Sequence, residues 1–234
     1  MPHALVTGGA RGIGGGIAAA LLDGGYTVTA TGLSEGEIAA VEPRDGLTLR
    51  VLDVTHEASV EVCLASLDRL DGLVNCAGTI MRGGAEFDPA NFERVIAVNL
   101  TGTMRMCVRA RPLLAETGGA IVNTASMLAF FGGPLVPAYS ASKGGVAQLT
   151  KSLAVAWAKD GIRVNAIAPG WVETELTRSL AEDESRSSGI LARTPMGRWG
   201  RPGDIGGAAV FLLSKQAAFV TGTILPVDGG YAVA

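Results

Sequence analysis

ALVTGGARGIG, residues 4–14, joins a short apolar run to a glycine-rich turn and then to the start of a helical pattern. Residues 4–7, Ala-Leu-Val-Thr, form a short apolar run, which predicts a buried strand. Residues 13–22 predict a helix rich in small side chains. A strand that runs through glycines directly into a helix is the first unit of a parallel α/β sheet.

The glycines of this turn are Gly8, Gly12 and Gly14. They allow a sharp turn and a close approach of a pyrophosphate, whose charge then lies at the N-terminus of the following helix. The spacing is Gly-x-x-x-Gly-x-Gly rather than the commoner G-x-G-x-x-G. The alternative interpretation is a tight turn with close helix–strand packing, which Gly15 and Gly16 would also serve. Its place between the first strand and the first helix favours a dinucleotide site.

Short apolar runs alternate with helical patterns along the rest of the chain, without a linker, charge run or internal repeat. Continuously apolar strands indicate a parallel sheet that is covered on both faces. We therefore predict one α/β domain over residues 1–234, a doubly wound, Rossmann-like parallel sheet with helices on both faces. The further expected strands are residues 27–31, 47–54, 73–77, 120–126, 163–168 and 224–227, and the further expected helices are 35–41, 58–67, 91–98, 101–114, 139–159 and 204–213.

Composition excludes several classes of protein. The chain has 234 residues and a formal net charge of −3, which suits one α/β domain and argues against a nucleic-acid surface. No apolar run is long enough to span a bilayer, and the N-terminal residues lack the basic region of a signal peptide. Cys63, Cys76 and Cys107 are odd in number and predict reduced thiols in a cytoplasmic protein. His3 and His56 have no ligand cluster around them, so no metal site is expected.

Six motifs in this order resemble the short-chain dehydrogenase/reductase family, over essentially the whole chain. They are TGGARGIG at 7–14, NCAG at 75–78, Asn99 in VNL, Ser126, YSASK at 139–143 and PGWVET at 169–174. The resemblance implies NAD(P)-dependent hydride transfer between the nicotinamide and a secondary alcohol or ketone. Ser126-Met127-Leu128, FGG at 131–133 and RTPMGRWGRP at 193–202 are most similar to sugar and sugar-acid dehydrogenases of the gluconate 5-dehydrogenase group. The resemblance to 3-oxoacyl-carrier-protein reductases is almost as broad and remains an alternative.

Tyr139 and Lys143 stand one helical turn apart, so the phenol and the ammonium share one helix face. Hydride transfer to a carbonyl leaves an alkoxide that needs a proton, and a phenol of pKa near 10 is a poor base in the reverse direction. An ammonium about 4 Å away contributes roughly 4 kcal/mol at an effective dielectric near 20, enough to bring that pKa to about 7. We therefore predict Tyr139 as acid/base and Lys143 as the group that lowers its pKa. The alternative is an ordinary amphipathic contact.

Other roles follow from the resemblance or from position. Ser126, at the end of the fifth strand, would hydrogen-bond the substrate oxygen, or else cap a helix. Asn99 resembles the asparagine that holds a water in the proton relay from Lys143 to solvent; the alternative is a structural role in a turn. Lys143 would, by the same resemblance, also hydrogen-bond the nicotinamide ribose. Asp53 resembles the aspartate that meets the adenine amine, or is a plain loop carboxylate. The expected cofactor-binding residues are Gly8, Arg11, Gly12, Ile13, Gly14, Ser34, Asp53, Val54, Asn75, Ala77, Gly78, Tyr139, Lys143, Pro169, Gly170, Val172 and Thr174.

The choice between cofactors depends on the end of the second strand. Enzymes that select NAD carry an acid there, and this chain has Gly32. Arg11 is placed to meet a 2′-phosphate, to which Ser34 could donate a hydrogen bond. Against this, Arg11 could stack on adenine and Glu35 could repel a phosphate. These residues favour NADP(H) over NAD(H).

The substrate end is less specific. Residues 171–199 are expected to form a variable substrate lid. Trp171, Met127 and Phe131 either line an apolar wall or pack ordinarily. Arg82 either binds a substrate carboxylate or is a solvated loop arginine, and the substrate itself is not identified.

Apolar surface on the helices at 101–114 and 139–159, and on the C-terminal segment 224–234, exceeds what one sheet can cover. The resemblance implies a homotetramer with two-fold axes, with a dimer as the alternative. Two rival functions remain: a catalytically silent nucleotide-sensing or scaffold protein, and a sugar-nucleotide epimerase. The retained Tyr139, Lys143 and Ser126 argue against the first, and the chain length and glycine spacing argue against the second.

Overall fold

Seven parallel strands form one sheet in the computed structural model, which describes residues 1–234. The strand order is β3-β2-β1-β4-β5-β6-β7, and every neighbouring pair is parallel. The predicted fold class is therefore confirmed. The strands are β1 (His3–Thr7), β2 (Thr27–Gly32), β3 (Leu47–Val51), β4 (Gly72–Asn75), β5 (Ala120–Thr124), β6 (Arg163–Pro169) and β7 (Ile224–Val227).

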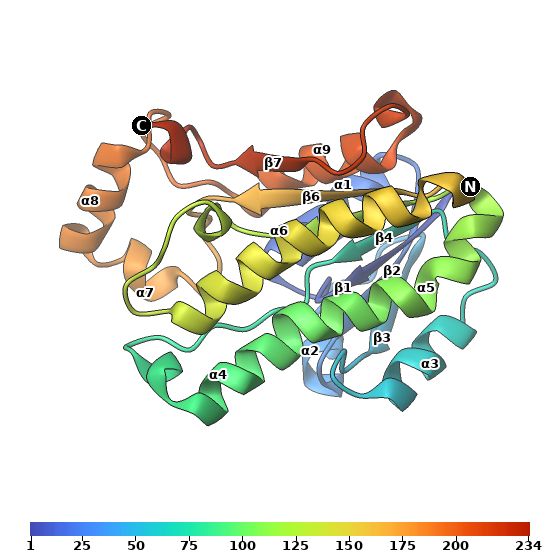
Figure 1. The fold of residues 1–234 in the computed structure, drawn as a ribbon, viewed down its shortest axis with the longest axis horizontal. Coiled ribbons are helices and arrows are strands. Elements are labelled where there is room, and N and C mark those ends of the chain that lie inside the picture. The colour runs from blue at the N-terminus through green and yellow to red at the C-terminus, as the bar shows by residue number, and fades with distance from the viewer.

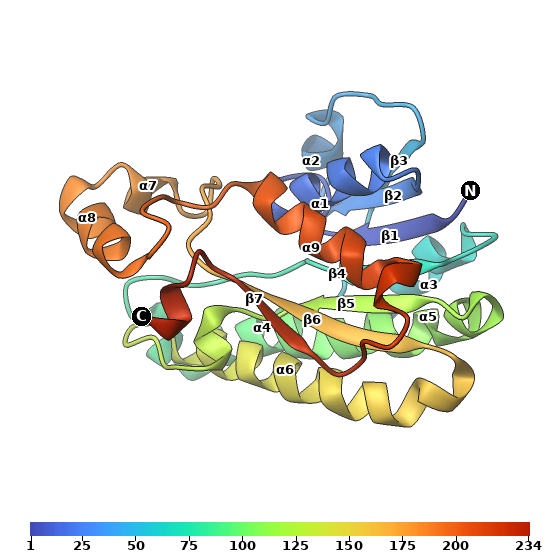
Figure 2. The same ribbon diagram turned by 90° about the horizontal axis from the view of Figure 1, so that it is seen from above.

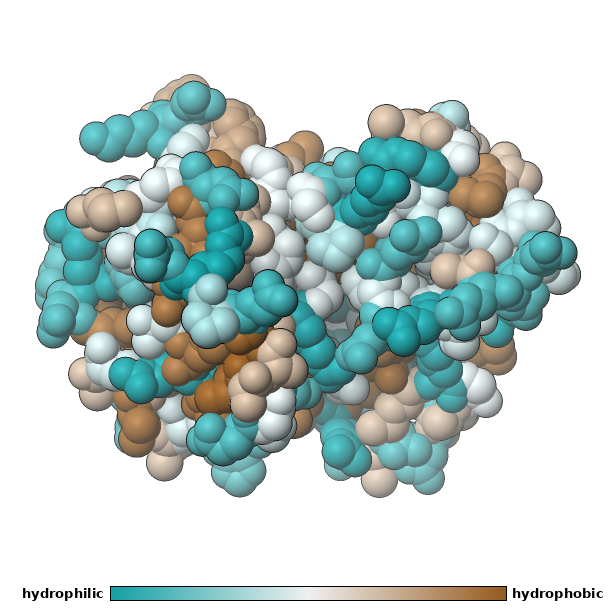
Figure 3. All heavy atoms as spheres, turned by 180° about the vertical axis from the view of Figure 1, so that it is seen from behind, coloured by the Kyte–Doolittle hydropathy of each residue, from teal (hydrophilic) through white to brown (hydrophobic).

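Helices cover both faces of the sheet, as Figures 1 and 2 show. Helices α1 and α9 pack on one face, and α3, α5 and α6 pack on the other. The face seen in Figure 3, opposite α5 and α6, mixes hydrophilic residues with smaller apolar patches. The helices are α1 (Gly12–Asp23), α2 (Glu35–Ala39), α3 (Glu57–Ala65), α4 (Pro89–Ile96), α5 (Thr103–Thr117), α6 (Pro137–Trp157), α7 (Arg178–Ala181), α8 (Glu184–Arg193) and α9 (Pro202–Leu213).

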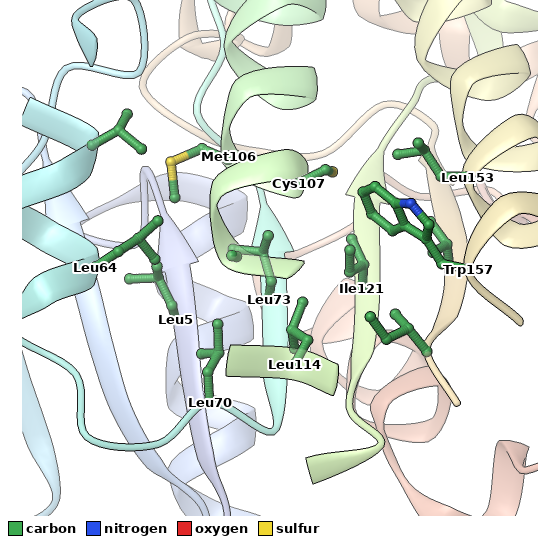
Figure 4. Close-up of a cluster of buried hydrophobic side chains, with 14 of the residues drawn as sticks. Leu5, Leu64, Leu70, Leu73, Met106, Cys107, Leu114, Ile121, Leu153 and Trp157 are labelled. Atoms are coloured by element: carbon green, nitrogen blue, oxygen red, sulfur yellow. The ribbon is translucent and has the colours of Figure 1, made fainter. Parts of the chain in front are cut away.

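Strand residues alternate between two apolar cores, because successive side chains point to opposite faces of a sheet. On one face, Leu5, Leu73 and Ile121 pack with Met106 and Leu114 of α5 (Figure 4). On the other face, the neighbouring positions of the same strands pack against α1 and α9. Both faces of the central strands are thus buried, which explains why those strands are apolar throughout.

The strand order reverses between β1 and β4, and this reversal determines where the site lies. Strands β1 and β4 are neighbours, with Thr7 paired to Asn75, although two strand–helix units separate them in sequence. Their helices leave on different faces, so the carboxyl ends of β1 and β4 open a crevice between them. Ligands of doubly wound sheets bind at this crevice.

Two local predictions differ from the structure. Residues 91–114 do not form two separate helices, because α4 continues through a π-helical segment, Ala97–Gly102, directly into α5. Gly16 packs against Pro202 of α9 rather than against a strand, since a Cβ at Gly16 would lie 2.5 Å from the Pro202 carbonyl carbon.

The segment 171–199 contains the short helices α7 and α8, which stand off from the sheet (Figure 2). None of the helices combines the length and the apolar character needed to cross a membrane.

Candidate active site

The glycine-rich turn after β1 lies directly against the NCAG segment after β4. A Cβ on Gly8 would lie 2.9 Å from the Ala77 Cα atom, and a Cβ on Gly14 would lie 2.2 Å from the Gly8 carbonyl oxygen. Gly8 also has a φ of 64°, in the left-handed region that favours glycine. Thr7 Oγ1 accepts hydrogen bonds from the N–H groups of Cys76 and Ala77, both at 3.1 Å. Two segments predicted to bind the cofactor thus form one backbone cradle.

Helix α1 presents free backbone donors to this cradle. It begins at Gly12, no side chain caps it, and its first turn, which includes Ile13, has no acidic residue. Such an N-terminus suits a pyrophosphate, because its N–H groups lack partners and its dipole favours negative charge. Thr174 lies across the turn, with its Cγ2 atom 3.7 Å from where a Gly12 Cβ would be. The cradle therefore fits a dinucleotide.

The predicted catalytic side chains lie together at the carboxyl ends of β4 and β5. Lys143 is buried, and its ammonium donates to the Thr124 carbonyl at 2.7 Å and lies 5.4 Å from the centre of the Tyr139 ring. Ser126 follows β5, and its Oγ accepts from the Leu128 N–H at 3.2 Å. Ser126 also lies close enough to the Tyr139 phenol to lower its pKa. The structure thus shows the capping contact of Ser126 and places the residue beside Tyr139.

Asn99 is buried in the π-helical segment, and its side-chain amide is engaged by protein groups. Its Oδ1 accepts from the Thr79 N–H at 2.8 Å, and its Nδ2 donates to the Thr79 carbonyl and to Ser142 Oγ. Asn99 and Lys143 flank Gly78, where a Cβ would lie 3.3 Å from Asn99 Oδ1 and 3.8 Å from Lys143 Nζ. The structure therefore brings Asn99 to the site and assigns its side chain to holding the backbone after β4. A π-helical turn at such a position is common in functional sites.

Burial dominates the electrostatics of the Tyr139–Lys143 pair. It raises the pKa of Tyr139 to about 12, although Ser126 and Arg82 both act to lower that pKa. It also lowers the pKa of Lys143 to about 8. Burial opposes the expected effect of Lys143, whose ammonium faces the Thr124 carbonyl and the tyrosine ring, because both groups are desolvated. Tyr139 is therefore protonated at neutral pH and able to act as an acid. The lowering of the Tyr139 pKa by Lys143 together with a positively charged nicotinamide stays a prediction.

The acid beside the second strand is Glu37, which sequence reasoning missed. A Cβ on Gly32 would lie 2.9 Å from the Glu37 Cβ, so the glutamate occupies the space above the glycine. Glu37 accepts hydrogen bonds from the Leu33 N–H at 2.8 Å and from Arg11 Nη2 at 3.0 Å. Arg11 also pairs with Glu175 at 2.8 Å. Glu35, which the sequence analysis named as the repelling acid, makes no such contact.

A sequence signal for Glu37 does exist. Ser34 caps α2 by accepting from the Glu37 N–H at 3.3 Å, and Ser-x-x-Glu is the capping-box pattern, which places a glutamate at the start of a helix. Here the carboxylate turns to the Leu33 N–H and to Arg11.

The remaining predicted cofactor residues differ in what they can offer. Asp53 Oδ1 accepts from the backbone and hydroxyl of Thr55. Val54 is buried, and its carbonyl accepts from Arg105. The Asn75 side chain turns into the interior, toward Cys107 Sγ and Asn123 Oδ1, so Asn75 can offer only backbone to a ligand.

The segment after β6 lies at the same edge of the sheet. It is held by a hydrogen bond from the Gly170 N–H to the Val227 carbonyl and by a bridge between Val172 and Gly200. Pro169 is the last residue of β6 and begins this segment. Further along it, the Thr174 N–H donates to Thr177 Oγ1 at 3.0 Å.

Arg82 reaches across the site. Its Nη2 donates to the Leu176 carbonyl at 3.1 Å, which connects the loop after β4 to residues 171–199. Burial, and then the charge of Arg186 on α8, lowers the pKa of Arg82, whereas Tyr139 raises it. The charge of Arg82 also acts on Tyr139, whose pKa it lowers. Arg82 is therefore at the site, and Arg186 is a neighbour that no motif indicated.

Aromatic side chains line the substrate end. The rings of Trp171 and Trp199 lie 5.7 Å apart, and those of Trp171 and Tyr231 lie 6.3 Å apart. Arg193 lies over the rings of Tyr231 and Phe131 at 4.4 and 5.0 Å. Met127 is buried beside Ser126. Trp171 and Phe131 therefore belong to one aromatic group that includes the C-terminal Tyr231.

Known proteins share this arrangement. Residues 8–232 match the family described as enoyl-(acyl carrier protein) reductase. A 2-dehydro-3-deoxy-D-gluconate 5-dehydrogenase from Bacillus subtilis is 45% identical over 97% of this chain and 93% of that protein. A 3-oxoacyl-[acyl-carrier-protein] reductase from Vibrio harveyi is 39% identical, with 97% of this chain and 96% of that protein covered.

A solved structure agrees with the sequence matches. A gluconate 5-dehydrogenase from Burkholderia cenocepacia, in complex with NADP and tartrate, has a TM-score of 0.93 and 35% identity, covering 100% of this chain and 96% of that one. The glycine cradle, the Tyr139–Lys143 pair and these matches agree with the resemblance that the motifs indicated. The chain therefore belongs to the short-chain dehydrogenase/reductase family and is an NAD(P)-dependent oxidoreductase that acts on alcohol or ketone groups.

Proposed function

We propose that this enzyme interconverts a secondary alcohol and a ketone on a sugar acid. The observation that carries the proposal is the position of Arg82, which lies near Tyr139 and Arg186 and contacts residues 171–199. A guanidinium beside the acid/base, with a second one near it, favours a substrate that carries a carboxylate. The similarity to dehydrogenases named for gluconate derivatives supports the same substrate class. Residues 171–199 would form the lid over that substrate.

The reaction needs few protein groups. The bound nicotinamide supplies or accepts the hydride. In the direction of reduction, Ser126 donates a hydrogen bond to the carbonyl oxygen, and Tyr139 delivers the proton that the resulting alkoxide requires. Lys143 lies under the Tyr139 ring, where its charge stabilises the phenolate left behind. Oxidation runs through the same groups in reverse, with Tyr139 as the base.

A pair of substrates tests the proposal. The enzyme should turn over an aldonate far better than the polyol of the same chain length. Arg82→Met should raise KM for the aldonate about 10- to 100-fold, because a charged hydrogen bond is lost, and should leave the polyol nearly unchanged. Arg69→Met, on the distant Asp71 pair, is the control. Preference for a 3-oxoacyl thioester over both would favour the alternative, a 3-oxoacyl-carrier-protein reductase, which the Vibrio relative represents.

For the cofactor, we infer a preference for NADP(H), supported by Gly32 and Arg11. Glu37 opposes it, since its carboxylate holds Arg11 and would repel a 2′-phosphate. Glu37→Gln should therefore tighten NADPH binding about ten-fold and leave NADH within two-fold, as measured by fluorescence titration. Gly32→Asp is a poor test, because its Cβ would lie 2.9 Å from the Glu37 Cβ. If NADH bound wild type ten-fold more tightly than NADPH, the preference would be wrong.

We also propose a homotetramer. Apolar side chains remain exposed on α5 at Met104 and Val108, on α6 at Val155, on α9 at Phe211 and after α9 at Phe219. Isologous contacts across two-fold axes would cover these side chains, since each axis needs only one self-complementary patch. Sedimentation equilibrium at micromolar concentration should give a mass near four chains, with a dimer as the alternative, whereas a species of 23.9 kDa would contradict assembly.

A cytoplasmic location is proposed from the cysteines. Cys63, Cys76 and Cys107 are all free, and disulfides are the rule in oxidising compartments rather than in the cytoplasm. Cell fractionation tests it.

A further inference from the structure

The helix that carries Tyr139 and Lys143 lacks a side-chain cap of its own. Helix α6 begins at Pro137, and the N-cap residue is Val136, whose side chain cannot accept a hydrogen bond. The first turn contains no acidic residue. An N-cap side chain normally accepts from the second or third backbone N–H of the helix, and here the third belongs to Tyr139. The backbone N–H of Tyr139 therefore needs a hydrogen-bond acceptor from another part of the chain.

That partner is Glu86, from the 3₁₀ turn Ala85–Phe87. Its side chain is 1% exposed, and its Oε2 accepts from the Tyr139 N–H at 2.8 Å. Its Oε1 accepts from the Met81 N–H at 2.9 Å. Met81 precedes Arg82, so one buried carboxylate connects the loop that carries Arg82 to the first turn of α6. The two segments are 53 residues apart in sequence between Glu86 and Tyr139.

The chemistry of these contacts requires a carboxylate. Both partners are N–H donors, and an ionised carboxyl group accepts at both oxygens without presenting a hydrogen of its own. A glutamine would accept at one oxygen and present an N–H group to the other donor. Burying a charge is costly unless hydrogen bonds satisfy it, and a helix N-terminus favours an anion. Glu86 meets both conditions.

We propose that Glu86 is a positioning residue that sets the phenol of Tyr139 relative to Arg82 and Ser126. It acts through the backbone and touches neither cofactor nor substrate. The proposal rests on Tyr139 being the acid/base of the proposed reaction. It predicts that the two sides of the substrate site, the loop after β4 and the start of α6, move as one unit only while both hydrogen bonds are present.

Glu86 also contributes to the electrostatics of the phenol. The groups that act on Tyr139 are Ser126 and Arg82, which lower its pKa, and Cys76 and Glu86, which raise it; the Lys143 ammonium lies over the ring. Removing the Glu86 charge therefore lowers the pKa of Tyr139. The limb of the pH–rate profile that reports Tyr139 should move to lower pH.

The experiment compares Glu86→Gln with wild type, and with Glu93→Gln, an exposed glutamate on the neighbouring α4, as the matched control. We expect kcat to fall about 10- to 100-fold, cofactor Kd to stay within two-fold, and the pH–rate limb to shift to lower pH. The control should match wild type. An unchanged kcat and pH profile in a folded Glu86→Gln protein would overturn the proposal.

A second variant separates positioning from helix stability. Val136→Ser adds a local N-cap that can accept from the Tyr139 N–H, but it cannot restore the link to Met81. In the Glu86→Gln background it should restore the melting temperature and leave kcat low, and this double variant is the one measured if Glu86→Gln alone does not fold. Full recovery of kcat would show a merely structural role and overturn the proposal. Each kcat is expressed as a ratio to the wild-type kcat on any substrate that the wild-type enzyme turns over. An error in the proposed substrate therefore does not affect this test.

Discussion

Tyr139→Phe is expected to lower kcat about 10³- to 10⁴-fold while cofactor affinity stays within two-fold. The ring keeps its packing, and the change removes only the hydroxyl that exchanges a proton with the substrate oxygen. General acid–base groups contribute factors of about 10² to 10⁴. The half-buried phenol has a raised pKa and is protonated at neutral pH, so the loss should appear already in ketone reduction.

The measurement is steady-state reduction at saturating NADPH, with cofactor Kd from fluorescence titration. Tyr26→Phe is the matched control, because Tyr26 lies at the start of β2 and far from the crevice. That variant should retain wild-type activity. If Tyr139→Phe kept more than about a tenth of the wild-type kcat, another group would have to supply the proton, and the assignment of Tyr139 would fail.

The order of strands and helices could be predicted because burial leaves a plain record in the sequence. Leu73 and Val74 point to opposite faces of the sheet and are both buried, so an apolar run without alternation indicated a strand covered on both sides. Strand ends were less predictable. The expected strand 47–54 ends at Val51, because the end of a strand depends on its neighbour, and β2 ends at Gly32, which pairs with Val51.

The catalytic motifs could be found because their residues are close in sequence or follow identifiable strands. Glu86 could not be found in this way, since it acts through backbone N–H groups whose orientation only the folded chain defines. Glu37 has a signal in the Ser-x-x-Glu pattern, but its contacts with the Leu33 N–H and Arg11 appear only in the folded chain. The effect of burial on the pKa values of the catalytic pair could not be predicted for a related reason. A distance of one helical turn between Tyr139 and Lys143 says nothing of desolvation, which outweighs the attraction between them in the folded protein.

Lys143→Met is expected to lower kcat/KM more than about 100-fold, because the phenolate loses the only ammonium beside its ring. Methionine keeps much of the buried stem, so packing changes little. Lys151→Met, an exposed lysine on the same helix, is the matched control and should behave as wild type. Wild-type activity in Lys143→Met would remove Lys143 from the proposed mechanism.

The same substitution has a predictable effect on stability. Folding lowers the pKa of Lys143 from 10.5 to about 8, so the fold disfavours the charged form. Below pH 8 both states carry the charge, and its burial opposes folding by something on the order of 3 kcal/mol. Between pH 8 and pH 10.5 the unfolded chain binds more protons than the folded one, so this group makes wild type more stable as pH rises.

Lys143→Met lacks this group, so its free energy of unfolding should exceed that of wild type at pH 7, and the difference should shrink toward pH 10.5. Tyr139, with its raised pKa, acts in the opposite sense only above pH 10, which lies outside the measured range. Urea unfolding at pH 7 and pH 10, followed by tryptophan fluorescence, measures the difference. A variant that is less stable than wild type at pH 7, with a constant difference up to pH 10, would mean that the hydrogen bond to Thr124 stabilises Lys143 more than its burial opposes folding.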